Sequence, residues 1–262
     1  IRLSLVGSEM CIRDSRSAPR GRPEVVYLPA CVNTMFGGAI PGEKTTEFAM
    51  ISLLTAAGIG VTVPAGIDSL CCGTPWKSKG MTKGYATMRR RVVDIMRRAT
   101  RDGELTVISD AVSCSEGFVH ELEYEGAEGI RVVDAVQYVA DAVLPVMPAL
   151  PKVASAALHP TCSSTRMGWN DSLQRCAEAV ADEVVVADAW GCCGFAGDRG
   201  MLHPELTESA TRHEATELAE REFDLYLSAN RTCELGMERA TGKPWRHVLS
   251  VLAERMVEYA PA

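Results

Sequence analysis

The chain has 262 residues, of which 47% are hydrophobic and 23% are charged, and its formal net charge is −7. This composition is ordinary for a folded globular protein with one or two cores, and it argues against a disordered chain. Proteins that bind nucleic acid normally carry a basic excess, so we expect no nucleic-acid partner.

The beginning of the chain reads as an artefactual or disordered leader over residues 1–22. Residues 1–15 lack an initiator Met and resemble translated sequencing-adapter sequence, and residues 15–23 are basic and rich in proline and glycine. Cys11 is therefore left out of the predicted site. The first apolar run is too short for a secretory signal, and longer apolar stretches are interrupted by glycine, proline or charged residues. We expect a cytoplasmic protein, with peripheral contact at the inner face of the membrane left open.

Short apolar segments alternate with helical patterns along the rest of the chain. Strands are predicted at residues 24–29, 60–64, 105–109, 131–133, 153–158, 183–187 and 224–228. Helices are predicted over residues 45–57, 80–101, 135–144, 171–181, 204–222 and 245–259. This alternation predicts an α/β fold with mostly parallel strands and right-handed crossovers.

Two Cys-Cys-Gly turns show that the chain contains an internal duplication. Cys71-Cys72-Gly73 is echoed by Cys192-Cys193-Gly194, residues 26–31 match residues 157–162, and residues 107–114 match residues 226–233. A repeat of this length suits an α/β half-domain better than a solenoid unit. We therefore predict two duplicated halves with parallel sheets, a first repeat over residues 23–150 and a second over residues 151–262.

Each repeat places four cysteines on segments that follow predicted strands. Adjacent cysteines cannot face the same way on a regular strand, so each vicinal pair belongs on a bent loop. The carboxyl ends of parallel strands gather at one edge of a sheet, which brings such loops together. We predict one metal site in each half, with the ligands Cys31, Cys71, Cys72, Cys114 and Cys162, Cys192, Cys193, Cys233.

The cysteines admit other interpretations. Without an export signal, a disulfide framework is disfavoured. Cys176 has no counterpart in the first repeat and is read as a small buried hydrophobe. Four thiolates select zinc or an iron–sulfur cluster, and ligands spread over three segments suit the larger cluster better than a single zinc ion. A zinc-stabilised scaffold without a redox role remains the alternative.

Polar residues near the cysteines have more modest interpretations. His159 and His203 precede prolines near the second set, and a turn-forming or supporting role is favoured over ligation because the thiol sets are complete. Lys77, Arg199 and Arg231 either raise a cluster potential or are ordinary surface cations. The basic run at residues 89–91 is read as a solvated helix face.

The cysteine frame resembles the cysteine-rich CCG domain, which occurs twice in a component of heterodisulfide reductase and in the iron–sulfur component of glycolate oxidase. Complete motifs of that family end in Cys-x-x-Cys, but Ala111 and Asn230 stand at the first of these positions here. A fifth thiol is thus absent from both halves. The resemblance therefore implies an ordinary 4Fe–4S cubane rather than an unusual non-cubane cluster.

Residues 159–164, 191–206 and 230–234 are similar to the C-terminal region of FAD-linked, iron–sulfur D-lactate dehydrogenases, and the match covers roughly residues 25–257. This resemblance implies an upstream FAD domain and a ferredoxin-like segment as partners, neither of them in this sequence. It also implies electron transfer from the flavin to a quinone or cytochrome, with no catalytic or FAD-binding residue here and no lactate oxidation by this part alone. A separate CCG subunit of a lactate-utilisation or heterodisulfide-reductase-like complex is the competing interpretation.

Overall fold

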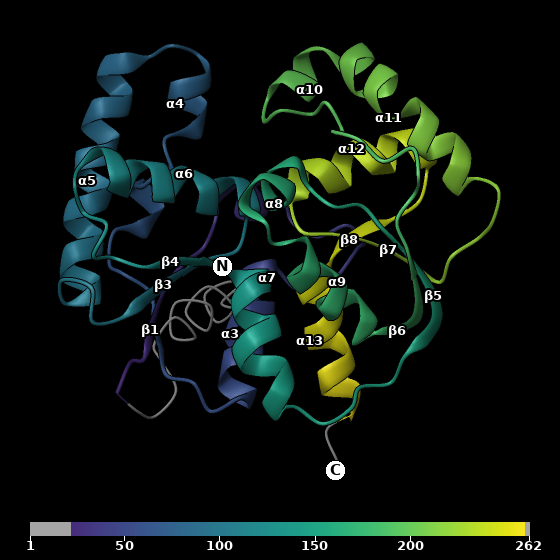
Figure 1. Cartoon of the computed structure of the whole chain (residues 1–262), viewed down its shortest axis with the longest axis horizontal. Coiled ribbons are helices and arrows are strands. Elements are labelled where there is room, and N and C mark those ends of the chain that lie inside the picture. Colours follow the sequence, from purple (N-terminus) through teal and green to yellow (C-terminus); the bar gives the residue numbers. More distant parts are fainter. Residues whose placement is uncertain (1–21, 260–262) are drawn as a thin grey trace, which may run out of the picture.

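The computed structural model describes residues 22–259, with side chains to residue 256. The expected leader at residues 1–22 lies outside the described residues apart from Arg22, and so does Cys11. The described chain forms two four-stranded parallel sheets, with the orders β2-β1-β3-β4 and β6-β5-β7-β8 (Figure 1). The predicted α/β class with two duplicated parallel-sheet halves is confirmed.

The first half runs from β1 to η3. Its elements are β1 (Val25–Leu28), α2 (Cys31–Phe36), α3 (Thr46–Ala56), β2 (Val61–Thr62), η1 (Ile67–Ser69), α4 (Thr74–Ser78), α5 (Thr82–Thr100), β3 (Thr106–Ser109), α6 (Val112–Tyr124), β4 (Val132–Asp134), α7 (Ala135–Tyr138), η2 (Val139–Val143) and η3 (Leu144–Val146). The strand β1 pairs in register with β3, from Val25 opposite Thr106 to Leu28 opposite Ser109. Both strands therefore end at the same edge of the sheet, where their cysteine-bearing segments begin.

The second half repeats this strand order. Its elements are β5 (Val153–Leu158), α8 (Cys162–Met167), α9 (Asn170–Glu178), β6 (Ala181–Val185), α10 (Arg199–Leu202), α11 (Pro204–Leu218), β7 (Leu225–Ser228), α12 (Arg231–Thr241), β8 (Trp245–His247) and α13 (Val248–Tyr259). The strand β5 lies between β6 and β7, as β1 lies between β2 and β3.

Alternation along the strands builds two apolar layers on each sheet. In β1, Val25 and Tyr27 join one buried cluster, while Val26 and Leu28 join another on the opposite face. In β7, Leu225 and Leu227 join the first of these clusters, and Tyr226 faces away from it. The central strands β1 and β7 are buried on both faces, as expected for parallel sheets covered by helices, whereas the edge strand β6 is partly exposed.

One buried cluster is shared by the two halves. It includes Leu53 of α3, Val139 of η2, Leu173 of α9 and Leu252 of α13, together with inward-facing residues of both sheets. These helices occupy the space between the two sheets in Figure 1. The two halves therefore share one helical layer and one hydrophobic core, and are not two separate domains joined by a linker.

The prediction that the last helix starts at Trp245 is wrong. Trp245–His247 forms the strand β8, in register with Tyr226–Ser228 of β7, and α13 begins only at Val248. The Trp245 side chain is completely buried against Tyr226, with ring centroids 5.5 Å apart. The segment thus completes the second sheet just as β4 completes the first.

The prediction that residues 89–91 form a solvent-exposed helix face is wrong for Arg89. Its side chain is buried, its Nε lies 2.5 Å from Glu125 Oε1, and its guanidinium lies 3.5 Å from the centre of the Tyr124 ring. Arg90 and Arg91 are exposed, as expected. The ion pair and the aromatic ring satisfy a cation that the sequence pattern alone places in water.

Within residues 22–259, none of the helices combines the length and the apolar character that crossing a bilayer requires.

Candidate metal centre

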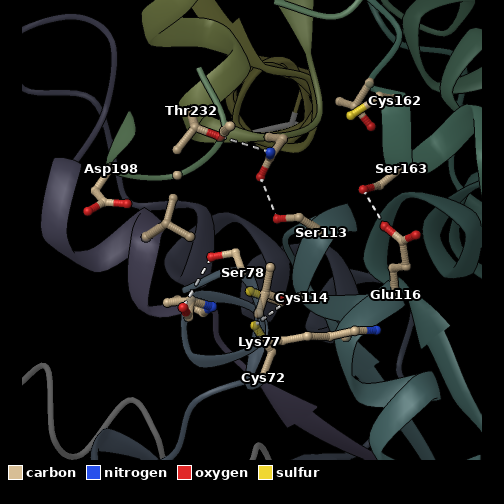
Figure 2. Close-up of a pocket in the computed structure, with 18 of the residues that line it drawn as sticks. Cys72, Lys77, Ser78, Ser113, Cys114, Glu116, Cys162, Ser163, Asp198 and Thr232 are labelled. Carbon is tan, nitrogen blue, oxygen red and sulfur yellow. Dashed lines mark hydrogen bonds between the residues drawn. The ribbon is translucent and has the colours of Figure 1, made fainter. Parts of the chain in front are cut away.

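All eight cysteines predicted as metal ligands line one cavity of about 650 Å³ between the two halves. Figure 2 shows Cys72 and Cys114 on one side of it and Cys162 on the other. Their exposure follows the duplication: Cys72, Cys114, Cys193 and Cys233 are buried, and Cys31, Cys71, Cys162 and Cys192 are at least partly open to solvent. The fold therefore collects thiols that are up to about 200 residues apart in sequence, as expected from converging strand ends.

Three segments bring the first set to the cavity. Cys31 is the first residue of α2, Cys114 lies in the first turn of α6, and Cys71-Cys72 lies on the loop before α4. Gly73 makes the bend with φ of 75°, and a Cβ at this position would lie 2.4 Å from the Tyr85 ring. Only glycine fits both the backbone angle and the space, so the vicinal pair depends on it.

The second set has the same arrangement. Cys162 is the first residue of α8, Cys233 lies in the first turn of α12, and Cys192-Cys193 lies on the loop between β6 and α10. Gly194 has φ of 68°. The bent loops predicted for both vicinal pairs are confirmed, whereas the helices that begin at or beside the other cysteines, α2, α6, α8 and α12, were not predicted. Six-residue helices such as α2 and α8 are too short to show a periodic apolar pattern.

In the first half, neighbouring thiols shift the pKa values of one another in pairs. The pKa of Cys71 is raised, first by its interaction with Cys72 and then by burial, and the pKa of Cys72 is raised chiefly by its interaction with Cys114. Burial raises the pKa of Cys31, and the neighbouring Cys71 adds to this effect. Burial and neighbouring thiols together therefore raise the pKa values of Cys31, Cys71 and Cys72.

The second half repeats these interactions. The pKa of Cys162 is raised first by its interaction with Cys192 and then by burial. At Cys193 the hydrogen bond with Cys192 acts to lower the pKa, but the interaction with Cys233 and burial outweigh it. A cation held by the sulfurs would remove this penalty, because metal binding requires deprotonated thiolates. Soft donors from both halves thus line the cavity, and among the described residues one group of three donor atoms lies within 4.8 Å of one another, that of Cys193, Cys233 and His159 in the second half.

A buried histidine lies behind the second set. His159 is completely buried, and its Nδ1 is 2.8 Å from Glu214 Oε1. The donor atoms of His159, Cys193 and Cys233 all lie within 4.8 Å of one another. Burial acts to lower the pKa of His159, but the interactions with Cys193 and Glu214 raise it to about 9. His203, by contrast, is exposed and lies 3.1 Å from Glu205.

A polar cluster on the cavity wall joins the halves. Glu116 of α6 accepts a hydrogen bond from Ser163 at 2.6 Å (Figure 2). It also accepts from Arg166 at 2.8 and 2.6 Å. The hydrogen bond with Arg166 lowers the pKa of Glu116, and Arg166 acts to lower the pKa of the adjacent Cys162. This cluster was not predicted from the sequence because neither Glu116 nor Arg166 belongs to the repeated pattern.

Asn230 of the second half contacts a cysteine of its own half and a serine of the first half. Its side-chain NH₂ group lies 3.8 Å from Cys233 Sγ and can donate to this sulfur, and its carbonyl oxygen accepts from Ser113 of α6 at 3.4 Å. Asn230 therefore offers a hydrogen bond to the thiol instead of a further sulfur ligand.

The predicted cations have different surroundings. Lys77 is exposed and lines the cavity, whereas Arg199 is exposed and lies outside its lining. Arg231 is buried, lies 3.2 Å from Glu234 and donates to Gly38 O at 3.2 Å. Of these three cations, Lys77 is the one whose side chain lines the cavity.

The buried interpretation of Cys176 is confirmed. The residue lies in α9, is completely buried, and its thiol donates to Val136 O at 3.6 Å.

The solved structures that align with the chain include those of racemases and a racemase homologue. The chain aligns over 90% of its length with a putative Asp/Glu racemase from Yersinia pestis (99% of that chain, 10% identity, TM-score 0.39). It aligns over the same share with an aspartate racemase homologue from Pyrococcus horikoshii OT3 (98% of that chain, 10% identity, TM-score 0.36). Glutamate racemase isoform RacE1 from Bacillus anthracis also matches over 90% of the chain (81% of that chain, 10% identity, TM-score 0.37).

The sequence pattern of a cysteine-rich domain matches the chain twice, over residues 25–118 and 156–238. The two matches contain one set of four cysteines each, and together they cover more than half of the chain. The chain therefore belongs to the CCG family of cysteine-rich domains and contains two copies of the domain.

Proposed function

We propose that this chain is the iron–sulfur electron-transfer region of an FAD-linked D-2-hydroxy acid dehydrogenase of the D-lactate dehydrogenase type. The observation that carries the proposal is the placement of eight thiols, four from each half, around a single cavity. CCG domains are typical of iron–sulfur oxidoreductase subunits, which supports a redox role in general. The long motifs around the second set, compared above with D-lactate dehydrogenases, support the finer assignment.

The donor set favours iron and sulfide over a single zinc ion. Structural zinc sites usually take their ligands from closely spaced pairs, whereas each set here comes from three separate segments. Thiolates are the ordinary ligands of 4Fe–4S clusters. In the first half these would be Cys31, Cys71, Cys72 and Cys114, and in the second half Cys162, Cys192, Cys193 and Cys233.

The residues of the chain would hold the clusters and set their surroundings. An iron–sulfur cluster supplies a store for single electrons, which a flavin on an upstream domain would deliver and a quinone or cytochrome would accept. The buried thiols keep water from the inner side of each set, and the NH₂ group of Asn230 faces Cys233 Sγ. Hydrogen bonds to sulfur and burial are two of the means by which a protein sets a cluster potential.

Anaerobic purification tests the metal content. The chain is loaded with iron and sulfide, its iron and acid-labile sulfide are measured per chain, and the reduced protein is examined by electron paramagnetic resonance (EPR) spectroscopy. We expect a brown protein with iron and sulfide bound in both halves. A colourless chain that retains zinc and takes up no sulfide would refute the electron-transfer role.

Two further measurements address the flavin partner. The loaded chain given D-lactate and a dye, without a flavoprotein, should reduce no dye, because no flavin is bound to take the hydride. Reading the gene upstream should reveal a flavin-binding domain in the same reading frame. A stop codon there would favour the separate CCG subunit instead.

A further inference from the structure

His159 occupies a position where the two halves differ in chemistry. In the duplicated sequence it corresponds to Leu28, which is buried in the apolar layer beside Cys72 and Cys114. The second half thus places an imidazole where the first half places an aliphatic side chain. A replacement of this kind is costly in a buried position unless both ring nitrogens have a use.

Within the part of the chain that the structure describes, only one of the two ring nitrogens has a hydrogen-bond partner. His159 Nδ1 lies 2.8 Å from Glu214 Oε1, and both side chains are almost completely buried. His159 Nε2 is also buried and makes no hydrogen bond of ordinary geometry, although the sulfur of Cys193 is close enough to raise the pKa of the ring. The carboxylate of Glu214 holds the ring through Nδ1 and leaves Nε2 as the nitrogen available to a further ligand.

The surroundings of Nε2 are those of a metal ligand. His159 Nε2 or Nδ1, Cys193 Sγ and Cys233 Sγ form a group whose donor atoms lie within 4.8 Å of one another, and all three residues are buried. Histidines that bind a metal through one nitrogen almost always donate the other N–H to a carboxylate or carbonyl group. Glu214 supplies that carboxylate from α11, and the indole rings of Trp190 and Trp245 lie 6.5 and 6.1 Å from the imidazole.

We propose that His159 binds the metal group of the second half through Nε2, alongside Cys193 and Cys233, and that Glu214 positions it. The proposal rests on the proposed function in taking that group to be an iron–sulfur cluster. Because a 4Fe–4S cluster takes four protein ligands, His159 would replace one of the two thiols outside the close group, Cys162 or Cys192, in the set given above. It assigns the second half a mixed sulfur and nitrogen donor set, whereas the first half has sulfur donors alone. The two halves then hold chemically different groups despite their common fold.

Pulsed EPR on the loaded and reduced chain measures the nitrogen directly. The protein is prepared with ¹⁴N- or ¹⁵N-labelled histidine, and a hyperfine coupling that changes with the label identifies a histidine bound to the cluster. We expect this coupling in the wild-type chain and its loss in His159→Asn, which keeps a side-chain N–H near Glu214. A loaded wild-type chain without the coupling, or an unchanged coupling in His159→Asn, would overturn the proposal.

Other histidines provide the controls. His120, His203 and His213 are exposed, so their combined replacement by Asn should leave the chain folded and the coupling intact. Loss of the signal in this triple variant would contradict the assignment to His159. The remaining histidine, His247, is replaced separately, and the coupling should survive. These variants decide the question even if His159→Asn does not fold.

Co²⁺ titration separates this proposal from the iron–sulfur assignment. Glu214→Gln should weaken Co²⁺ binding by about 10- to 100-fold, while Glu205→Gln, beside the exposed His203, should leave it unchanged. A wild-type chain that takes up no iron and sulfide refutes the proposed function. The labelled-histidine coupling is then measured on the Co²⁺-loaded chain, where its presence supports the His159 ligand and its absence overturns it.

Discussion

The two halves place their cysteines alike but secure them by different polar contacts. In the first half, Asp110 accepts hydrogen bonds from Tyr27 Oη and from the backbone N–H of Ala30, each at 2.6 Å, and so fixes the turn that leads into Cys31. In the second half, the residue that corresponds to Asp110 is Ala229, and a capping box between Thr161 and Ser164 fixes the turn before Cys162.

A second difference lies at the ends of the outer strands. Asp134 ends β4 and accepts from Val136 N at 2.9 Å, whereas His247 ends β8 and accepts through Nδ1 from Leu249 N at 3.3 Å. Each side chain starts the helix that follows. Both halves share the strand order and the placement of the thiols, whereas the hydrogen bonds that fix the turns and helix starts differ from one half to the other.

The largest expected effect comes from substituting one buried cysteine in each of the two thiol sets. Cys72→Ser and Cys193→Ser each replace a buried soft ligand by a hard hydroxyl, so each should lower the bound iron and sulfide by about half. The double variant should bind neither. Cys176→Ala, in which the replaced thiol is buried away from the cavity, serves as the matched control and should bind both normally.

Iron and acid-labile sulfide per folded chain measure this effect, with circular dichroism as the check of folding. A single variant that loses both clusters would show that the halves do not bind independently, and one that loses neither would remove the cysteine from the ligand set.

The strand-end groups should give the halves opposite pH dependences. Burial raises the pKa of Asp134 to about 7, so its stabilising contribution is complete below its unfolded value of 3.8 and is lost as the pH rises toward 7. Burial lowers the pKa of His247 to about 4, so its contribution is complete above its unfolded value of 6.5 and is lost as the pH falls toward 4. By these shifts the change in unfolding free energy is about 4 kcal/mol for Asp134 and about 3 kcal/mol for His247.

Urea unfolding of the metal-free chain between pH 4 and 7 tests this pair. Asp134→Asn should make stability rise more steeply with pH, and His247→Asn should make it fall more steeply, because each removes one of two opposing contributions. Both substitutions keep a side-chain oxygen that can accept from the following helix. Identical pH profiles for the two variants would contradict the expected opposition.

The smallest effect concerns the turn before Cys162. Thr161 Oγ1 accepts from Ser164 N at 3.0 Å, so Thr161→Ala should lower the unfolding free energy by about 1 kcal/mol. The corresponding Ala30 of the first half has no side-chain cap to lose. Thermal unfolding measures the difference, and a Thr161→Ala chain as stable as wild type would show that the capping box adds nothing beyond the sheet contacts.

Much of the fold followed from the sequence because parallel strands buried on both faces leave a clear apolar signal. The strands at β1, β3, β5 and β7 were predicted within one or two residues, and the duplication of cysteines and flanks predicted the repeated architecture. The strand β8 was missed because its three residues, Trp245, Arg246 and His247, include two with polar groups. Arg246 is buried there because two carboxylates, Glu43 at 2.7 Å and Glu254, pair with its guanidinium.

The site was predictable where it repeats and hidden where it does not. The eight cysteines were found from their spacing, and the structure brings all of them to one cavity. The Glu214–His159 contact and the Glu116–Arg166 pair join residues about 50 positions apart in sequence and have no counterpart in the other repeat. Only the three-dimensional packing of α6, α8 and α11 reveals them.

The helical layer between the sheets has a consequence for how such a molecule can arise. Both repeats contribute residues to the hydrophobic cluster that contains Leu53 and Leu252. One repeat expressed alone would therefore expose a large hydrophobic surface to water. A second identical copy would offer a closely matching face related by a two-fold axis. Gene fusion of such a self-associating ancestor would give the present architecture, and it would free each half to acquire its own chemistry beside a shared interior.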